Sequence, residues 1–224
     1  MSANDIVLAI TGASGSAYAI RLAQVLLAAD KQVHLVVSGA ARQVLARELE
    51  AEFPENNASS AEWSAMIEAT LAGPIGGSWG FRPLADSLLT GQGSMRTYGI
   101  SDYSAGIASG SFLTSGMVIC PCSMGTLSSI ATGASTNLIQ RAADVHLKEH
   151  RPLVLVPRET PLSFIQLENM TRLSQAGATI MPSMPGFYHK PLQIADLVDF
   201  VVARILDHLR VEHTLMERWG QEPG

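Results

Sequence analysis

Two apolar segments of strand length each end in a turn of small and hydroxyl-bearing residues and lead directly into a helical pattern. The first runs from Ile6 to Ser16 and the second from Met117 to Thr126. A parallel sheet places such turns at its carboxyl edge, where backbone N–H groups and hydroxyls hold phosphates or a flavin ring. Two turns of this kind in one chain therefore predict a nucleotide-type cofactor bound along that edge.

Strand and helix patterns alternate along most of the chain. Continuous apolar runs predict strands at residues 5–10, 32–38, 117–120, 153–156 and 178–181. Apolar periodicity predicts helices at residues 16–29, 41–51 and 194–209, and another helix that continues to His150. Ser163 and Gln166 form a capping box for a further helix, which Gly177 ends. This alternation predicts one α/β domain over residues 1–224, with a single doubly wound parallel sheet of the Rossmann or flavodoxin-like type and helices on both faces.

The charged residues of the first and last helices are expected on their outer faces. In the first helix Arg21, Gln24 and Lys31 form a polar stripe. In the last helix Asp196 and Asp199 lie on the polar side, where we expect them to face solvent.

Residues 54–111 carry the weakest signal, and residues 54–98 among them indicate only loop and helix. Their glycine-rich stretch at residues 73–80 predicts a loop.

The composition limits the class of protein. Hydrophobic residues make up 47% of the 224 residues and charged residues 16%, which indicates a buried sheet and extensive contact between subunits. The net charge of −5 gives no basic surface for nucleic acid or an anionic membrane. An uncharged apolar run of about 18 residues and a basic N-terminal stretch are both missing, so we expect a cytoplasmic protein. Cys120 and Cys122 are expected to be buried thiols.

The first turn differs from the dinucleotide-binding fingerprint. Ser14 and Ala17 stand where that fingerprint requires glycines, and Ser38 replaces the acidic residue that would hold an adenine ribose. These differences disfavour NAD and FAD and favour a mononucleotide with a single phosphate. A simpler alternative is that residues 11–14 only cap a helix.

Charged chemistry is concentrated after the strand at residues 153–156. Arg158 and Glu159 follow it directly between Pro157 and Pro161, which makes Glu159 a candidate general acid/base. The alternative is an ordinary surface ion pair.

Other candidate groups lie on the neighbouring helices and on a loop. Arg141 and Lys148 are two helical turns apart, so they either bind a phosphate or form a solvated stripe with Asp144. Tyr188 lies in a stiff loop, and Arg204 follows on the last helix.

Several of these strings resemble the UbiX-type flavin prenyltransferases. They are residues 11–15, 108–111, 121–126, 137–144, 151–161, 167–170 and 184–189. The resemblance covers residues 5–50 and 100–220 and leaves residues 54–98 unmatched.

The resemblance implies a transferase that joins a dimethylallyl group from dimethylallyl phosphate to N5 and C6 of reduced flavin mononucleotide (FMN). It implies that prenylated FMN then serves UbiD-type decarboxylases, one of them in ubiquinone biosynthesis. It also implies a large homo-oligomer, expected to be a dodecamer, with sites at subunit contacts. Basic side chains and a monophosphate are consistent with a site that needs no metal, because Asp196 and Asp199 are the nearest approach to an aspartate cluster.

Site residues are carried over by matching motif. The residues implied to contact FMN are Gly12, Ala13, Ser14, Ser38, Ser123, Met124, Gly125, Thr126 and Arg158. The residues implied for dimethylallyl phosphate are Arg141, Lys148, Tyr188, Arg204, Tyr103 and Trp219. Glu159 matches the acid/base, and Ser14 and Glu48 complete the catalytic set. Trp219 belongs to a C-terminal tail, residues 210–224, that is expected to fold over the site. Tyr103 stands where the family is expected to have Trp, which keeps an aromatic face.

Two other classes remain open. A flavin-dependent cysteine decarboxylase shares the fold, but it uses an early catalytic histidine, and His34 here lies within a predicted strand. A non-catalytic flavin carrier is the second alternative.

Overall fold

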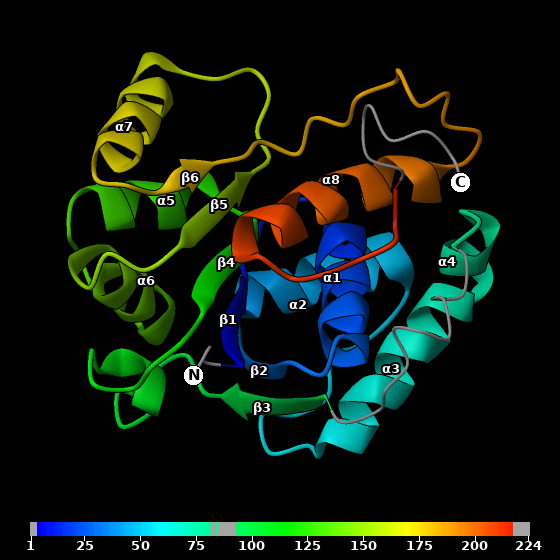
Figure 1. Ribbon diagram of the computed structural model, residues 1–224, viewed down its shortest axis with the longest axis horizontal. Helices are drawn as coiled ribbons and strands as arrows, with labels where there is room; N and C mark the ends of the chain where they lie inside the picture. The colour runs from blue at the N-terminus through cyan, green and yellow to red at the C-terminus, as the bar shows by residue number, and fades with distance from the viewer. Residues whose placement is uncertain (1–3, 82–83, 85–92, 217–224) are drawn as a thin grey trace.

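The computed structural model describes residues 4–81, 84 and 93–216 and is built around one parallel sheet (Figure 1). The strand order is β3-β2-β1-β4-β5-β6. The strands are β1 (Asp5–Ile10), β2 (Gln32–Val37), β3 (Ser94–Tyr98), β4 (Gly116–Cys122), β5 (Leu153–Pro157) and β6 (Thr179–Ile180). β1 pairs with β2 in register from Asp5 opposite Gln32 to Ile10 opposite Val37. The predicted doubly wound α/β fold is confirmed.

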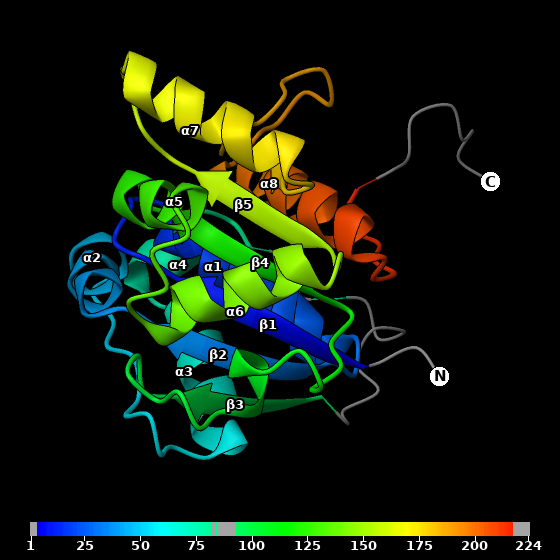
Figure 2. The same cartoon turned by 90° about the vertical axis from the view of Figure 1, so that its left-hand side faces the viewer.

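Helices cover both faces of the sheet (Figure 2). One face packs against α1 (Ser16–Ala28), α2 (Gly39–Leu49), α3 (Ser60–Ala72) and α8 (Ile194–Leu209). The other face packs against α5 (Met124–Ala131), α6 (Leu138–Lys148) and α7 (Phe164–Gln175). Successive residues of a strand serve the two cores in turn, so that Leu8 packs on the first face and Val7 on the second. Strands buried on both faces explain the continuous apolar runs in the sequence.

Residues 54–98 contain more regular structure than the sequence predicts. α3 begins with a capping box formed by Ser59 and Glu62, a signal that identifies this helix. The predicted loop at residues 73–80 is wrong for Pro74–Ser78, which forms the short helix α4 with proline at its start. β3 is an edge strand of five residues, which is too short for its sequence pattern to predict a strand.

The helix expected to continue to His150 is in fact two helices. α5 ends at Ala131, and Gly133 then adopts a φ of +70°, which breaks the helical path. The side chain of Asn137 accepts a hydrogen bond from the Gln140 backbone N–H and starts α6.

Arg21 and Asp199 form a buried ion pair between α1 and α8. Arg21 Nε donates to Asp199 Oδ1 at 2.8 Å, and Arg21 Nη2 donates to Oδ2 at 3.1 Å. The guanidinium also lies over the Phe81 ring, 5.6 Å from its centroid. The expectation that both residues lie on exposed faces is therefore wrong, because the polar sides of the two helices face each other. A buried pair of this kind is costly to break on one side only.

The two cysteines are buried and free, as the sequence predicts. Burial raises the pKa of the Cys122 thiol to about 12, which keeps it protonated at neutral pH. Within the described residues, no helix is both long and apolar enough to cross a membrane.

Candidate functional site

The two hydroxyl-rich turns follow β1 and β4, which are neighbours in the sheet. From β1 the chain continues to β2 and β3 on one side, and from β4 it continues to β5 and β6 on the other. Such a topological switch point leaves a crevice at the carboxyl ends of the strands, where α/β sheets bind their ligands. The observed topology therefore brings the two turns together at the carboxyl edge of the sheet, where the sequence predicts the cofactor to bind.

Thr11 joins the two turns. Its Oγ1 donates to the carbonyl oxygen of Pro121 at 2.9 Å and accepts a hydrogen bond from the Ser123 backbone N–H at 2.7 Å. Ser123 in turn caps α5, and its Oγ donates to Thr126 Oγ1 at 3.1 Å. Thr11 is almost fully buried, so it fixes the relative position of the turns without facing the crevice.

Glycine is required at two positions of the first turn. A Cβ at Gly12 would lie 2.5 Å from the Ala40 Cβ, so only glycine lets the turn pass the start of α2. Gly15 has a φ of +121°, a conformation that other residues rarely adopt. The turn therefore places the exposed Ser14 close to the end of β2, where Ser38 caps α2.

The side chain of Glu48, a residue of α2, lies at the N-terminus of α1. Its carboxylate accepts hydrogen bonds from Gly15 N–H at 3.0 Å and from Ser16 N–H at 2.8 Å. Burial raises the pKa of Glu48, but hydrogen bonds from Ser14, Ser16 and Gly15 outweigh this effect and hold it below its usual value. α1 has no side-chain cap at Gly15, so the alternative that residues 11–14 serve only as a helix cap is not supported.

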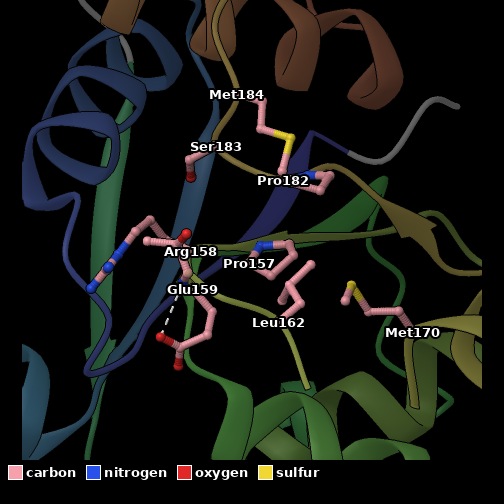
Figure 3. Close-up of a pocket in the computed structure, with 9 residues that line it drawn as sticks. Pro157, Arg158, Glu159, Leu162, Met170, Pro182, Ser183 and Met184 are labelled. Atoms are coloured by element: carbon pink, nitrogen blue, oxygen red, sulfur yellow. Dashed lines mark hydrogen bonds between the residues drawn. The ribbon is translucent and has the colours of Figure 1, made fainter. Parts of the chain in front are cut away.

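A pocket of about 230 Å³ lies where β5 and β6 end (Figure 3). Its walls are Pro157, Arg158, Glu159, Thr160, Leu162, Met170, Pro182, Ser183 and Met184. The exposed Glu159 carboxylate accepts a hydrogen bond from the Thr160 backbone N–H at 3.2 Å. In the part of the chain that the structure describes, no ion pair joins Glu159 to Arg158, and Figure 3 shows their side chains pointing apart. The simpler interpretation as a surface Arg–Glu pair is therefore not supported.

Arg158 carries an unused donor. Its Nε is buried and has no hydrogen-bond partner among the described residues. The carboxyl ends of β2 and β4 also carry the hydroxyls of Ser38, Ser123 and Thr126, and the residue that directly follows β2 is Ser38 rather than an acidic residue. This set of donors fits a mononucleotide with one phosphate better than a dinucleotide. The remaining predicted flavin-contact residues, Ala13, Met124 and Gly125, belong to the same two turns.

The three predicted phosphate-binding cations are not brought together within one chain. Arg141 donates from Nε to the Ala108 carbonyl oxygen at 3.0 Å and pairs with Asp144 at 2.9 Å. Lys148 is exposed at the far end of the same helix and pairs with Glu149. Arg204 lies on α8, which packs on the opposite face of the sheet, and pairs with Asp207 at 2.7 Å. None of the three lines the pocket that contains Glu159.

The aromatic candidates lie on the surface. Tyr188 is 65% exposed, and its ring contacts the rings of His189 and Phe200. Tyr103 is 48% exposed, and its hydroxyl donates to the Ser135 carbonyl oxygen at 3.4 Å. Trp219 lies outside the described residues, as does the end of the predicted tail.

Two residues of the site were not singled out from the sequence. Thr11 acts through the turns, and only the pairing of β1 with β4 reveals that role. Ser183 lines the pocket because its backbone N–H donates to the Pro157 carbonyl oxygen at 3.0 Å, beyond the end of β6. No local sequence signal identifies either contact, since each depends on a partner far away in the chain.

Comparisons with known proteins agree with this geometry. A sequence model of the family described as Flavoprotein matches residues 1–206. The flavin prenyltransferase UbiX of Pseudomonas aeruginosa is 48% identical over 217 residues, 97% of this chain and 94% of that protein. That extent means that the similarity also runs through residues 54–98, so the expectation that this stretch is unmatched is wrong.

Solved structures give the same result. AnUbiX (PadA1) in complex with FMN and dimethylallyl pyrophosphate has a TM-score of 0.77 and 36% identity, with 98% of each chain covered. A dodecameric FMN-dependent UbiX-like decarboxylase from Escherichia coli O157:H7 has a TM-score of 0.74 and 38% identity, with 97% of this chain and 100% of that chain covered. The sequence of the two turns, the topology of the sheet and the similarity to these relatives all indicate the same family. The chain belongs to the flavin prenyltransferase UbiX family of flavoproteins.

Proposed function

We propose that this protein is a flavin prenyltransferase that transfers a dimethylallyl group from dimethylallyl phosphate to N5 and C6 of reduced FMN. The observation that carries the proposal is the pair of hydroxyl-rich turns at the switch point, with the Arg158–Glu159 pocket at the end of the next strand, β5. Relatives named flavin prenyltransferases match nearly the whole chain, and a similar structure contains both FMN and dimethylallyl pyrophosphate.

FMN binding falls to the turns after β1, β2 and β4. The hydroxyls of Ser38 and Thr126 and the N–H groups at the start of α5 supply hydrogen-bond donors. The Ser14 and Ser123 hydroxyls already donate to Glu48 and Thr126, so they supply acceptor oxygens. Arg158 adds a fixed positive charge from the end of β5. Reduced FMN supplies the nucleophilic ring atoms, and the chain holds that ring in position.

The basic side chains stabilise the phosphate that leaves. Breaking the allylic C–O bond develops negative charge on the phosphate oxygens, which Arg141, Lys148 and Arg204 are suited to bind. The exposed rings of Tyr188 and Tyr103 present π faces to a developing allylic cation. The cations and the two tyrosines do not line the pocket of Glu159 within one chain. We therefore place the complete site between subunits.

Glu159 is the proposed acid/base. Closing the new ring at C6 leaves a proton on that carbon, which must depart before the flavin ring regains aromaticity. The Glu159 carboxylate lines the pocket and, among the residues that the structure describes, accepts a hydrogen bond only from its neighbour Thr160, so it keeps lone pairs free to accept that proton.

Exposed apolar residues support assembly into an oligomer. They gather at the start of α7 and in the loop before α8, and include Phe164, Ile165, Leu167, Met184, Phe187, Tyr188, Leu192 and Ile194. Apolar exposure of this extent is typical of surfaces that are covered in an assembly. We propose a homo-oligomer, a dodecamer as in the E. coli relative, which passes prenylated FMN to a UbiD-type decarboxylase.

A mass spectrum of the flavin tests the proposal directly. Purified protein is incubated anaerobically with reduced FMN and dimethylallyl phosphate, and the flavin is then extracted. We expect a flavin heavier by one isoprenyl unit. If FMN binds and only unmodified FMN is recovered, the protein is a flavin carrier instead. Release of carbon dioxide from a peptide with a C-terminal cysteine would identify a cysteine decarboxylase.

A further inference from the structure

Ser183 is a residue of the pocket to which the proposed chemistry gives no role. Its backbone N–H donates to the Pro157 carbonyl oxygen at 3.0 Å, so the segment after β6 is held directly against the end of β5. Pro157 is followed by Arg158 and Glu159, and the pocket is lined by all four residues. Figure 3 shows the Ser183 hydroxyl on the side of the pocket where the Arg158 side chain leaves the backbone.

The Ser183 hydroxyl is buried and unsatisfied. Its Oγ is closed off from solvent and has no hydrogen-bond partner among the residues that the structure describes. A buried hydroxyl without a partner costs free energy, because it loses its hydrogen bonds to water and gains none in return. Arg158, which lines the same pocket, also has an unused donor at its buried Nε.

Two unused donors on residues that line one pocket suit one kind of ligand. An N–H from a cation and an O–H from serine together bind an electron-rich oxygen, such as that of a phosphate or a ring carbonyl. The other walls, Leu162, Met170, Pro182 and Met184, are apolar and suit a hydrocarbon or a flat ring. Rotation about the serine Cα–Cβ bond between staggered positions brings the hydroxyl to such an oxygen.

We propose that Ser183 is a ligand-binding residue whose hydroxyl donates a hydrogen bond to the same oxygen-bearing group that Arg158 binds. The inference deepens the proposed function and rests on it, because that function names the two ligands that carry such oxygens. They are FMN and dimethylallyl phosphate. On this proposal the bond forms when the ligand binds.

The test compares Ser183→Ala with Ser183→Thr, which keeps the hydroxyl, and with Ser174→Ala, a serine exposed on α7 outside the pocket. Three quantities are measured for each: unfolding of the FMN-free protein in urea, FMN affinity by fluorescence titration, and the KM for dimethylallyl phosphate. We expect Ser183→Ala to leave the stability of the FMN-free protein unchanged or slightly raised, since it removes an unsatisfied group. Ser183→Ala should weaken the binding of one of the two ligands by about three- to tenfold, with kcat nearly unchanged. Ser183→Thr should bind both ligands nearly as wild type does.

The ligand whose binding becomes weaker is the one whose oxygen accepts the hydrogen bond from Ser183. A loss in FMN affinity assigns it to the flavin, and a rise in KM alone assigns it to dimethylallyl phosphate. Three results overturn the proposal: unchanged affinity for both ligands, an equal loss in Ser183→Thr, or a marked loss of stability in the FMN-free Ser183→Ala variant. If the wild type binds FMN but prenylates nothing, the proposed function fails. The proposal for Ser183 is then judged by FMN affinity alone, and unchanged affinity overturns it.

Discussion

Glu159 lines the pocket, and within the described part of the chain its carboxylate accepts one hydrogen bond, from the backbone N–H of Thr160. Replacing Glu159 by Gln keeps the shape of the side chain and removes the base. We expect Glu159→Gln to bind FMN and dimethylallyl phosphate normally and to make little finished product. Anaerobic product formation, followed by mass spectrometry of the extracted flavin, measures the effect. Product formation at the wild-type rate would exclude Glu159 as the acid/base.

His146 is a buried residue whose charge state affects stability. Its Nδ1 donates to the Ala142 carbonyl oxygen at 2.7 Å, and its Nε2 lies 2.8 Å from the Thr114 hydroxyl. Burial lowers the pKa of His146 to about 4, from the usual histidine value of 6.5. The unfolded chain therefore takes up a proton near pH 6.5, where the folded chain resists it, and stability falls from there down to about pH 4.

The variant His146→Gln removes this titration. It should be less stable than wild type at pH 7, because Gln fills the site poorly. The difference between the two proteins should shrink by about 2–3 kcal/mol as the pH falls from 7 to 4. Urea unfolding at several pH values measures it, since other titrating groups cancel in the difference. A constant difference across this range would contradict a neutral buried His146.

Among the elements, β1 and β4 position the site through one shared side chain. Thr11→Val keeps the size of the residue and leaves the Ser123 N–H without its acceptor, which costs about 1–3 kcal/mol. We expect a lower midpoint in urea and weaker FMN binding, because the turn after β4 is no longer fixed. Thr11→Ser retains the hydroxyl and should behave nearly as wild type. Equal FMN affinity in Thr11→Val would show that the two turns keep their positions without this link.

The sequence predicts elements well where their signal is local. β1, β2, β4, β5 and α8 have apolar runs or a periodic face, and their predicted bounds agree with the structure to within two residues. Elements whose stability comes from tertiary contacts were missed, as for the edge strand β3. Arg21 was misplaced for the same reason, because its partner Asp199 is 178 residues away in the chain.

At the scale of the whole molecule, the three proposed phosphate-binding cations, Arg141, Lys148 and Arg204, do not line the pocket that contains Glu159. The resemblance implies all three, but no pattern in one chain reports which face of the sheet each will occupy. Arg141→Ala should reduce turnover of dimethylallyl phosphate about ten- to a hundredfold, with FMN affinity unchanged. Steady-state kinetics and FMN titration measure the two effects. Arg172→Ala, which removes an exposed cation paired with Glu168 on α7, is the matched control and should change neither. Normal turnover by Arg141→Ala would make Arg141 part of a solvated helix stripe.

Arg141 does not line the pocket of Glu159 within one chain, and this has a genetic consequence. If each site takes its acid/base from one subunit and its phosphate-binding cation from the next, two inactive alleles can complement each other. Co-expression of Glu159→Gln with Arg141→Ala in equal amounts should leave about a quarter of the sites with both wild-type residues. Activity of the mixed oligomer, set against each variant alone, counts those sites. A single active site would then be built from two copies of the gene product, so that neither subunit alone carries a complete site.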